Sequence, residues 1–149
     1  MTADVHSNHE RPTLSPPEVV AKFVSIKATD DWAKGGVTIL TQAVAVKETG
    51  PKETVSRFGE IYAFSPTFLA IQREKPTVIR IWNLQPDDEH DFALYGPKGE
   101  TLLYVKVPPL KELDYVMTFH QEGVFEFKCL MHQPMMSGQI LVTPTGKQP

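Results

Sequence analysis

The sequence has a single cysteine, Cys129, among its 149 residues. One cysteine excludes a disulfide within the chain, and it excludes a zinc or iron–sulfur site built from four thiolates. Three roles remain for this residue: a buried small side chain, a reactive thiol, or a metal ligand. Because composition does not choose between these roles, the neighbours of Cys129 in the sequence have to decide.

Long apolar runs are missing as well. No stretch approaches the roughly 18 apolar residues that a membrane-spanning helix needs. The polar N-terminus also lacks the apolar centre of a signal peptide. We therefore expect no membrane span. A cytoplasmic location does not follow, because a mature chain would already have lost its signal or its lipid anchor.

The chain carries little excess charge of either sign. Its 15 lysines and arginines against 18 acidic residues give a formal net charge of −3. This balance gives no electrostatic reason to expect nucleic acid as a partner. The length suits one domain with a substantial core rather than two.

Residues 1–54 are interpreted as an N-terminal tail and extension. After a polar tail, Ser15 and Glu18 flank two prolines in the pattern of a helix N-terminus, which predicts a short helix. The run 36–46 is rich in β-branched residues and fits a strand or a helix about equally well; we favour a strand. The charged run 47–53 resembles a linker, so we place the boundary of the core domain, 55–149, just after it.

Short apolar runs with turn residues between them follow from residue 56 onwards. The expected strands are 56–64, 67–72, 77–83, 90–95, 101–107, 113–119, 123–128 and 138–143. Seven or eight strands at this spacing predict an all-β fold, an antiparallel β-sandwich with Greek-key connections. No internal repeat is visible.

The segment around Cys129 holds several metal-ligand types. His132 follows three residues later, and Met135 and Met136 come next, before the last apolar run. Thiolate, imidazole and thioether together form a soft ligand set that selects copper over magnesium or calcium. A trigonal copper centre needs a second imidazole. His90 is the candidate, because it lies where one apolar run has ended and another begins.

These residues resemble the cupredoxin family of plastocyanin, amicyanin and azurin. The match consists of Cys-x-x-His, a Met-x-Gly before the last strand, and an upstream strand ending in Asn83 ahead of His90. The stretch 107–129 also resembles the copper domain of cytochrome oxidase subunit II. That domain needs a second loop cysteine for its dinuclear centre, so the resemblance implies one mononuclear copper per chain.

The resemblance implies His90, Cys129, His132 and one methionine as copper ligands. Counting back from the last strand favours Met136, whereas counting forward from His132 gives Met135 as the alternative. Alternative roles stay open from the residues alone: Cys129 as a core residue, and His90 as an exposed residue in an acidic turn. We expect no catalytic residues, since no separate general acid, base or nucleophile cluster is evident.

The implied function is one-electron transfer by copper that cycles between Cu(II) and Cu(I), with a cytochrome or an oxidase as redox partner. The alternatives are copper trafficking or storage, and a copper enzyme with an open coordination position of the red-copper type. The resemblance also implies a periplasmic or other extracytoplasmic location, with a signal or anchor removed. It leaves the oligomeric state open.

Overall fold

The computed structural model describes residues 17–30 and 36–146. Its elements run in the order α1 (Pro17–Phe23), β1 (Val24–Ala28), β2 (Gly36–Ala45), α2 (Lys52–Phe58), β3 (Ile61–Ser65), β4 (Phe68–Gln72), β5 (Thr77–Trp82), β6 (His90–Tyr95), β7 (Thr101–Val107), β8 (Glu112–Phe119), β9 (Gly123–Lys128), the 3-10 turn η2 (Leu130–His132) and β10 (Ser137–Thr143). Among the described residues, no helix is long and apolar enough to cross a membrane.

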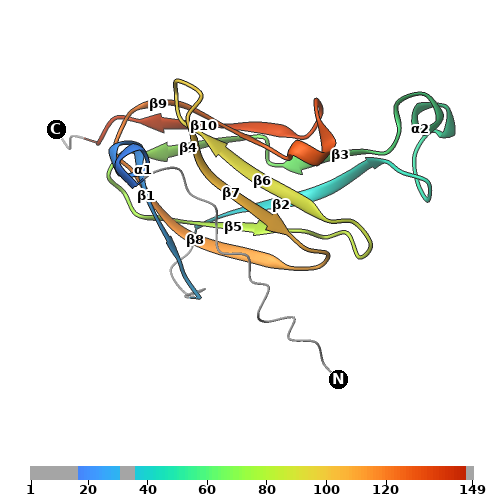
Figure 1. Ribbon diagram of the computed structural model, residues 1–149, viewed down its shortest axis with the longest axis horizontal. Helices are drawn as coiled ribbons and strands as arrows, with labels where there is room; N and C mark the ends of the chain where they lie inside the picture. The colour runs from blue at the N-terminus through green and yellow to red at the C-terminus, as the bar shows by residue number, and fades with distance from the viewer. Residues whose placement is uncertain (1–16, 31–35, 147–149) are drawn as a thin grey trace.

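The strands form two sheets that pack face to face (Figure 1). One sheet has the order β1-β8-β5-β2-β3, and the other has the order β4-β10-β9-β6-β7. The predicted β-sandwich is therefore confirmed. Most neighbours are antiparallel, and each sheet also contains one parallel pair, β2 with β5 and β10 with β4.

Residues 17–30 and 36–54 supply two strands of one sheet, β1 and β2, together with α1 and the start of α2. The predicted short helix is α1, and the run 36–46 is a strand, as favoured, because β2 pairs with both β3 and β5. The predicted strand 56–64 is wrong in its first half. Residues 52–58 form α2, which starts after Pro51 and ends at Gly59, where φ is 79°. The division into an extension and a domain at residue 54 stays a prediction, although the sheet crosses that point.

Alternating side chains of both sheets meet in an apolar core. In β8 the alternate side chains of Tyr115, Met117 and Phe119 are buried, as the pattern of a half-buried strand requires. Phenylalanine rings fill the space between the sheets. Phe127 stacks on Phe92 at 5.4 Å between ring centroids, and Phe64 meets both rings edge-on. Close packing of this kind fixes the strand ends, and therefore the loops that join them.

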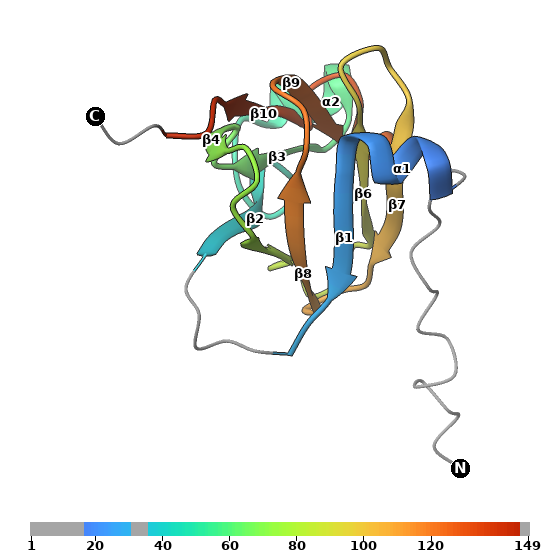
Figure 2. The ribbon, with the colours of Figure 1, turned by 90° about the vertical axis from the view of Figure 1, so that its left-hand side faces the viewer.

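The two ends of the sandwich carry different connections. At one end lie α2, the β5–β6 loop and η2, the orange-red coil that precedes β10 in Figure 1. At the other end lie α1 and the turn between β8 and β9, and Figure 2 shows α1 continuing into β1 beside β8. Because β9 runs between the two ends, Cys129 directly after it belongs to the first end.

Candidate metal centre

A histidine and a cysteine that are 39 positions apart in the sequence converge at the first end, together with a second histidine three positions after the cysteine. The Nδ1 atoms of His90 and His132 are 3.1 Å apart. The Sγ atom of Cys129 lies 3.4 Å from Nδ1 of His132 and 3.9 Å from Nδ1 of His90. His90 and Cys129 are fully buried and His132 is partly buried. The structure thus brings together the three predicted non-methionine ligands.

Strand pairing positions these three residues. His90 is the first residue of β6, and Cys129 follows β9, the strand beside β6. His132 is the last residue of η2, one short turn beyond Cys129. The loop closes on itself, because the amide of Cys129 donates to the carbonyl of Met136 at 2.9 Å and the amide of Met136 donates to the carbonyl of His132 at 3.1 Å.

The spacing of the donor atoms fits a metal ion. Bonds of about 2.0 Å to nitrogen and about 2.3 Å to sulfur, spread at about 110 to 120°, separate the nitrogens by about 3.4 Å and sulfur from nitrogen by about 3.6 Å. The two nitrogens are slightly closer than this, at 3.1 Å, and the two sulfur–nitrogen separations of 3.4 and 3.9 Å lie on either side of the expected value. One thiol and two imidazoles are also the donors that copper prefers. The residues present therefore fit a single copper ion.

A hydrogen-bonded network behind His90 fixes its tautomer. Nε2 of His90 lies 2.8 Å from Oε1 of Gln85, an oxygen that can only accept. The proton therefore sits on Nε2, and the lone pair of Nδ1 points at the other donor atoms. Asn83 supports this arrangement, since its Oδ1 accepts from the amide of Gln85 and its Nδ2 donates to the carbonyl of Val107. Such outer contacts orient a ligand before metal arrives.

Tyr62 of β3 covers both imidazoles. Its ring centroid lies 4.8 Å from that of His90 and 4.7 Å from that of His132, edge-on in both cases. The hydroxyl donates to Oδ2 of Asp88 in the β5–β6 loop. Burial raises the pKa of the Tyr62 phenol, and the carboxylate of Asp88 raises it further. The phenol therefore stays protonated and acts as a donor.

Burial also keeps the metal-free ligands uncharged. It lowers the pKa of His90 to about 4, with a further lowering from the neighbouring His132. Burial lowers the pKa of His132 in the same way. The pKa of the Cys129 thiol rises to about 11, mainly through burial. At neutral pH the site offers two neutral imidazoles and a thiol, so a metal ion would displace the thiol proton on binding.

Comparison with solved structures identifies the architecture. A variant of amicyanin in its Cu(I) form matches at a TM-score of 0.52 and 15% identity, over 81% of this chain and 99% of that chain. A copper-containing nitrite reductase from Thermus scotoductus matches at a TM-score of 0.54 and 16% identity, over 76% of this chain but only 28% of the enzyme. The chain has the cupredoxin fold. No protein-family model and no curated protein matches the sequence.

In this cupredoxin fold the two methionines of the loop differ sharply in exposure. Met136 is fully buried, directly before β10, whereas Met135 is 60% exposed. Gly138 follows, and a side chain there would collide with the ring of Phe127, since an added Cβ would lie 2.2 Å from Cζ. The glycine of the Met-x-Gly pattern therefore allows β10 to approach the core closely.

Several residues around the cluster of His90, Cys129 and His132 were not found from the sequence. They are Thr41, Tyr62, Gln85, Asp91 and Tyr104, which contact the ligands or the residues that hold them. Gln85 and Asp91 flank the loop that leads to His90, so proximity in sequence was a usable signal for them. Thr41 and Tyr62 come from strands far away in the chain, and no local pattern marks them.

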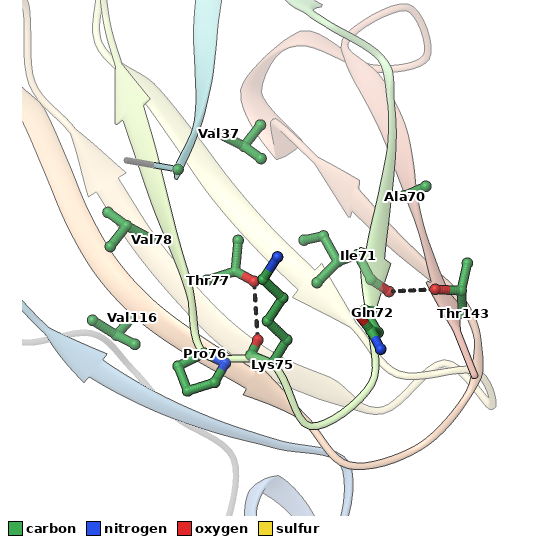
Figure 3. A pocket seen from close by; sticks show the side chains of 11 residues that line it. Val37, Ala70, Ile71, Gln72, Lys75, Pro76, Thr77, Val78, Val116 and Thr143 are labelled. Carbon is green, nitrogen blue, oxygen red and sulfur yellow. Dashed lines mark hydrogen bonds between the residues drawn. The ribbon is translucent and has the colours of Figure 1, made fainter. Parts of the chain in front are cut away.

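A separate hollow of about 610 Å³ lies at the far end of the cupredoxin sandwich. Figure 3 shows Val37, Ile71, Thr77 and Val116 among the residues around it, with Lys75 beside Thr77. The hollow is at the start of β5, whereas Asn83 and the ligand cluster are beyond the end of that strand. Among the residues that the structure describes, none that lines the hollow is a histidine, a cysteine or an acidic residue, so these residues add no ligand to the metal centre.

Proposed function

We propose that this chain is a mononuclear copper protein that carries one electron at a time. The observation that carries the proposal is the convergence of one sulfur and two imidazole nitrogens, within 4.8 Å of one another, at the buried end of a rigid sandwich. Copper bound there would supply the redox chemistry, by alternating between Cu(II) and Cu(I). The protein supplies the ligands, their orientation and the exclusion of water.

Each residue has a distinct part in this proposal. Cys129 would bind as the thiolate, and its sulfur accepts a hydrogen bond from the amide of Asp91 at 3.4 Å. His90 and His132 would bind through the Nδ1 atoms that face the sulfur. This trigonal set of two imidazoles and one thiolate is the arrangement of blue-copper electron-transfer sites, in which a weak axial methionine tunes the potential.

Burial supports Met136 as the fourth ligand. A methionine ligand has to lie inside the protein beside the other donors, and Met136 is fully buried in the same loop. Its backbone is also bound to Cys129 and His132, so the loop holds its Cα at a fixed place. Met135, the alternative, presents most of its side chain to solvent. Met136 would therefore be the fourth residue that holds the copper, and Met135 would lie at the protein surface.

The preformed loop supports electron transfer over metal exchange. Gln133 ties the loop further, because its Nε2 donates to the carbonyls of Cys129 and Met136 at 2.8 and 2.9 Å. A site whose ligands are fixed before metal binds changes little between the two oxidation states, and a small rearrangement favours fast electron transfer. A delivery or storage site would instead need ligands that open readily to release the ion.

The surface around His132 supports a transient encounter with a redox partner. Leu130, Met131 and Met135 are 48%, 45% and 60% exposed, and they lie within three positions of His132 in the sequence, whose imidazole is partly buried. Small apolar patches suit weak redox complexes. We propose that electrons enter or leave at His132, with a cytochrome or an oxidase as partner. A periplasmic or other extracytoplasmic location is part of the same proposal.

The visible absorption spectrum of the protein loaded with Cu(II) tests this function. We would record it for the wild type, for Met136→Ala, and for the matched exposed variant Met135→Ala. The proposal predicts an intense thiolate-to-copper band that shifts in Met136→Ala and stays in place in Met135→Ala. A wild-type protein without an intense band would overturn the copper–thiolate site. A strongly shifted wild-type band with evidence for bound water would instead favour a copper enzyme with an open position.

A further inference from the structure

Two exposed methionines flank His132 in the loop that follows β9. Met131 is 45% exposed and Met135 is 60% exposed, whereas Met117 and Met136, the other methionines that the structure describes, are fully buried. Single exposed apolar side chains are common on protein surfaces. Two thioethers beside one candidate ligand are different, because a thioether sulfur is itself a soft metal ligand. The loop thus carries two soft ligands on its outside as well as the buried donors within.

Backbone hydrogen bonds hold both methionines next to His132. Met131 precedes His132 in η2, where the amide of His132 donates to the carbonyl of Cys129 at 3.3 Å. The amide of Met136 donates to the carbonyl of His132 at 3.1 Å. Met135 is therefore one position from a residue that is bonded to His132. Both thioethers start from a backbone that these bonds fix, and both reach solvent.

His132 is the one member of the ligand cluster that is not fully covered. His90 and Cys129 have 0% exposure, and His132 is partly buried. Tyr62, the ring that contacts both imidazoles, is also buried, with 2% exposure. A metal ion that arrives from solvent therefore has to pass the edge of the cluster at His132, the residue that the two exposed methionines flank in the sequence.

A covered and fixed ligand set hinders the entry of an ion. The side chain of Gln133 bonds the carbonyls of Cys129 and Met136, so the loop cannot open without losing these contacts. Cys129 also has to give up its proton before its sulfur can bind metal. A thioether has no proton to lose, so it can bind an ion at the surface while the thiol is still protonated. Ligands of this kind outside the loop would shorten the search for the buried site.

We propose that Met131 and Met135 form an entry site for Cu(I), which collects the ion at the surface and passes it to the buried ligands. The inference rests on the proposed function. In the transfer, Cu(I) exchanges the two thioethers for the sulfur of Cys129 and the imidazole nitrogens. The thiol proton passes to water, and no electron changes hands. Because soft sulfur ligands select Cu(I) over harder ions, the entry site favours the reduced ion.

The test compares metal-free wild type with the double variant Met131→Leu, Met135→Leu. Leucine keeps the approximate size and the apolar character of methionine while removing the sulfur. Leu130→Ala is the matched control, because Leu130 is 48% exposed in the same loop and carries no sulfur. Each full-length protein is mixed without oxygen with Cu(I) held by a coloured chelator, and the loss of the chelate's absorbance gives the transfer rate.

We expect the double variant to take up Cu(I) about tenfold more slowly than the wild type, because its loop offers no soft ligand outside the cluster. Leu130→Ala should match the wild type. The final Cu(I) affinity should be the same in all three proteins, since the buried ligands are intact. Uptake of Cu(II), for which a thioether is a poorer ligand, should also be the same.

Two kinds of failure are distinguishable in these rates. A wild type that takes up no Cu(I) would overturn the proposed function. A wild type that takes up Cu(I), but no faster than the double variant, would overturn only the entry site. The entry site would also be overturned if Leu130→Ala were slowed as much as the double variant, or if uptake of Cu(II) were slowed as much as uptake of Cu(I).

The methyl groups of the methionines give a direct readout of binding. Ag(I) is a soft ion with the charge of Cu(I), so it serves as the probe. With isotope-labelled methionine methyl groups, an equimolar amount of Ag(I) added to the Cu(I)-loaded wild type should shift the nuclear magnetic resonance signals of Met131 and Met135. The signal of the buried Met117 should stay in place. Unshifted signals from both exposed methionines would overturn the entry site even if the transfer rates differed.

Discussion

Histidines lie near both ends of β9, and their surroundings differ. Near its start, His120 is bonded to two partners, Ser25 Oγ at 2.7 Å from Nε2 and Glu74 Oε1 at 3.0 Å from Nδ1. All three side chains are partly or largely exposed. Near its end, His90 and His132 are covered, and their Nδ1 atoms face one another and a sulfur rather than a carboxylate or a hydroxyl.

This difference separates a histidine that completes a surface hydrogen-bond chain from two histidines that lie beside a cysteine in a cluster that could hold a metal ion. The carboxylate of Glu74 and the hydroxyl of Ser25 satisfy both nitrogens of His120, so nothing further is required there. In the cluster of His90, Cys129 and His132, the lone pairs of neighbouring donors are directed into one small space. A buried arrangement of that kind is stable when a cation occupies the space between the donors.

Removing the sulfur should have the largest effect. Cys129→Ser leaves an oxygen that copper binds poorly in place of the thiolate, so we expect complete loss of the intense visible band. His120→Asn, at the other end of β9, should leave the band unchanged. Absorption spectra of the Cu(II)-loaded variants check this prediction. If an intense band survived in Cys129→Ser, Cys129 would not be the ligand that gives rise to it, and the two ends of β9 would not differ in the way we describe.

The hydrogen-bonded network behind His90 should contribute more to the free energy of unfolding than the hydrogen bonds of His120 with Ser25 and Glu74 do. Asn83→Ala would leave the buried carbonyl of Val107 and the amide of Gln85 without partners, at about 1 to 3 kcal/mol each. We expect the free energy of unfolding of the metal-free protein to fall by about 4 kcal/mol. Denaturant unfolding measures this. Ser25→Ala is the control at the exposed end and should change it by less than about 0.5 kcal/mol.

Much of this arrangement could be predicted from the sequence, because the signals are local. Strands such as β6 and β9 were found from apolar runs between turn residues, and the spacing of Cys129 and His132 marked the ligand loop. His90 was found from its position at the start of a strand. These features depend on neighbours within a few residues, which is the range over which sequence patterns are informative.

The features that were missed have two causes, a local signal that was overlooked and pairing between distant parts of the chain. The helix α2 replaced the first half of an expected strand, because Pro51 and Gly59 delimit a turn of helix that partial alternation had obscured. Tyr62 reaches the site only because β3 pairs with β2, which itself lies beside β5 through a parallel pairing. The spacing of residues in the loop 129–136 gives no information on the contact that Tyr62 makes with the imidazoles.

Acid should destabilise the metal-free protein through the buried His90, near the end of β9. Burial lowers the pKa of His90 to about 4 in the folded state, against about 6.5 when unfolded. Above pH 6.5 both states are neutral at this site. As the pH falls from 6.5 to 4, only the unfolded state takes up the proton, so the free energy of unfolding should drop by about 1.4 kcal/mol per unit, roughly 3 kcal/mol in total.

Denaturant unfolding across this pH range measures the slope for the wild type, for His90→Gln and for His120→Asn. Removing His90 should reduce the slope, and His132, whose pKa burial also lowers, should account for a part that remains. The His120 variant should keep the slope of the wild type. If the slope disappeared in His120→Asn and persisted in His90→Gln, the acid sensitivity would arise near the start of β9, and our assignment to His90 would be wrong.

The smallest effect should come from the hydroxyl that ties Tyr62 to the loop. Tyr62→Phe keeps the ring against both imidazoles and removes the hydrogen bond to Asp88, so we expect a loss of about 1 kcal/mol in the free energy of unfolding. Tyr62→Leu also removes the aromatic edge and should in addition change the visible band of the copper-loaded protein, because the imidazoles would lose the ring that holds their orientation. If both variants gave the same spectrum as the wild type, the ring would cover the ligands without orienting them, and the network of Asn83 and Gln85 alone would fix the imidazole of His90.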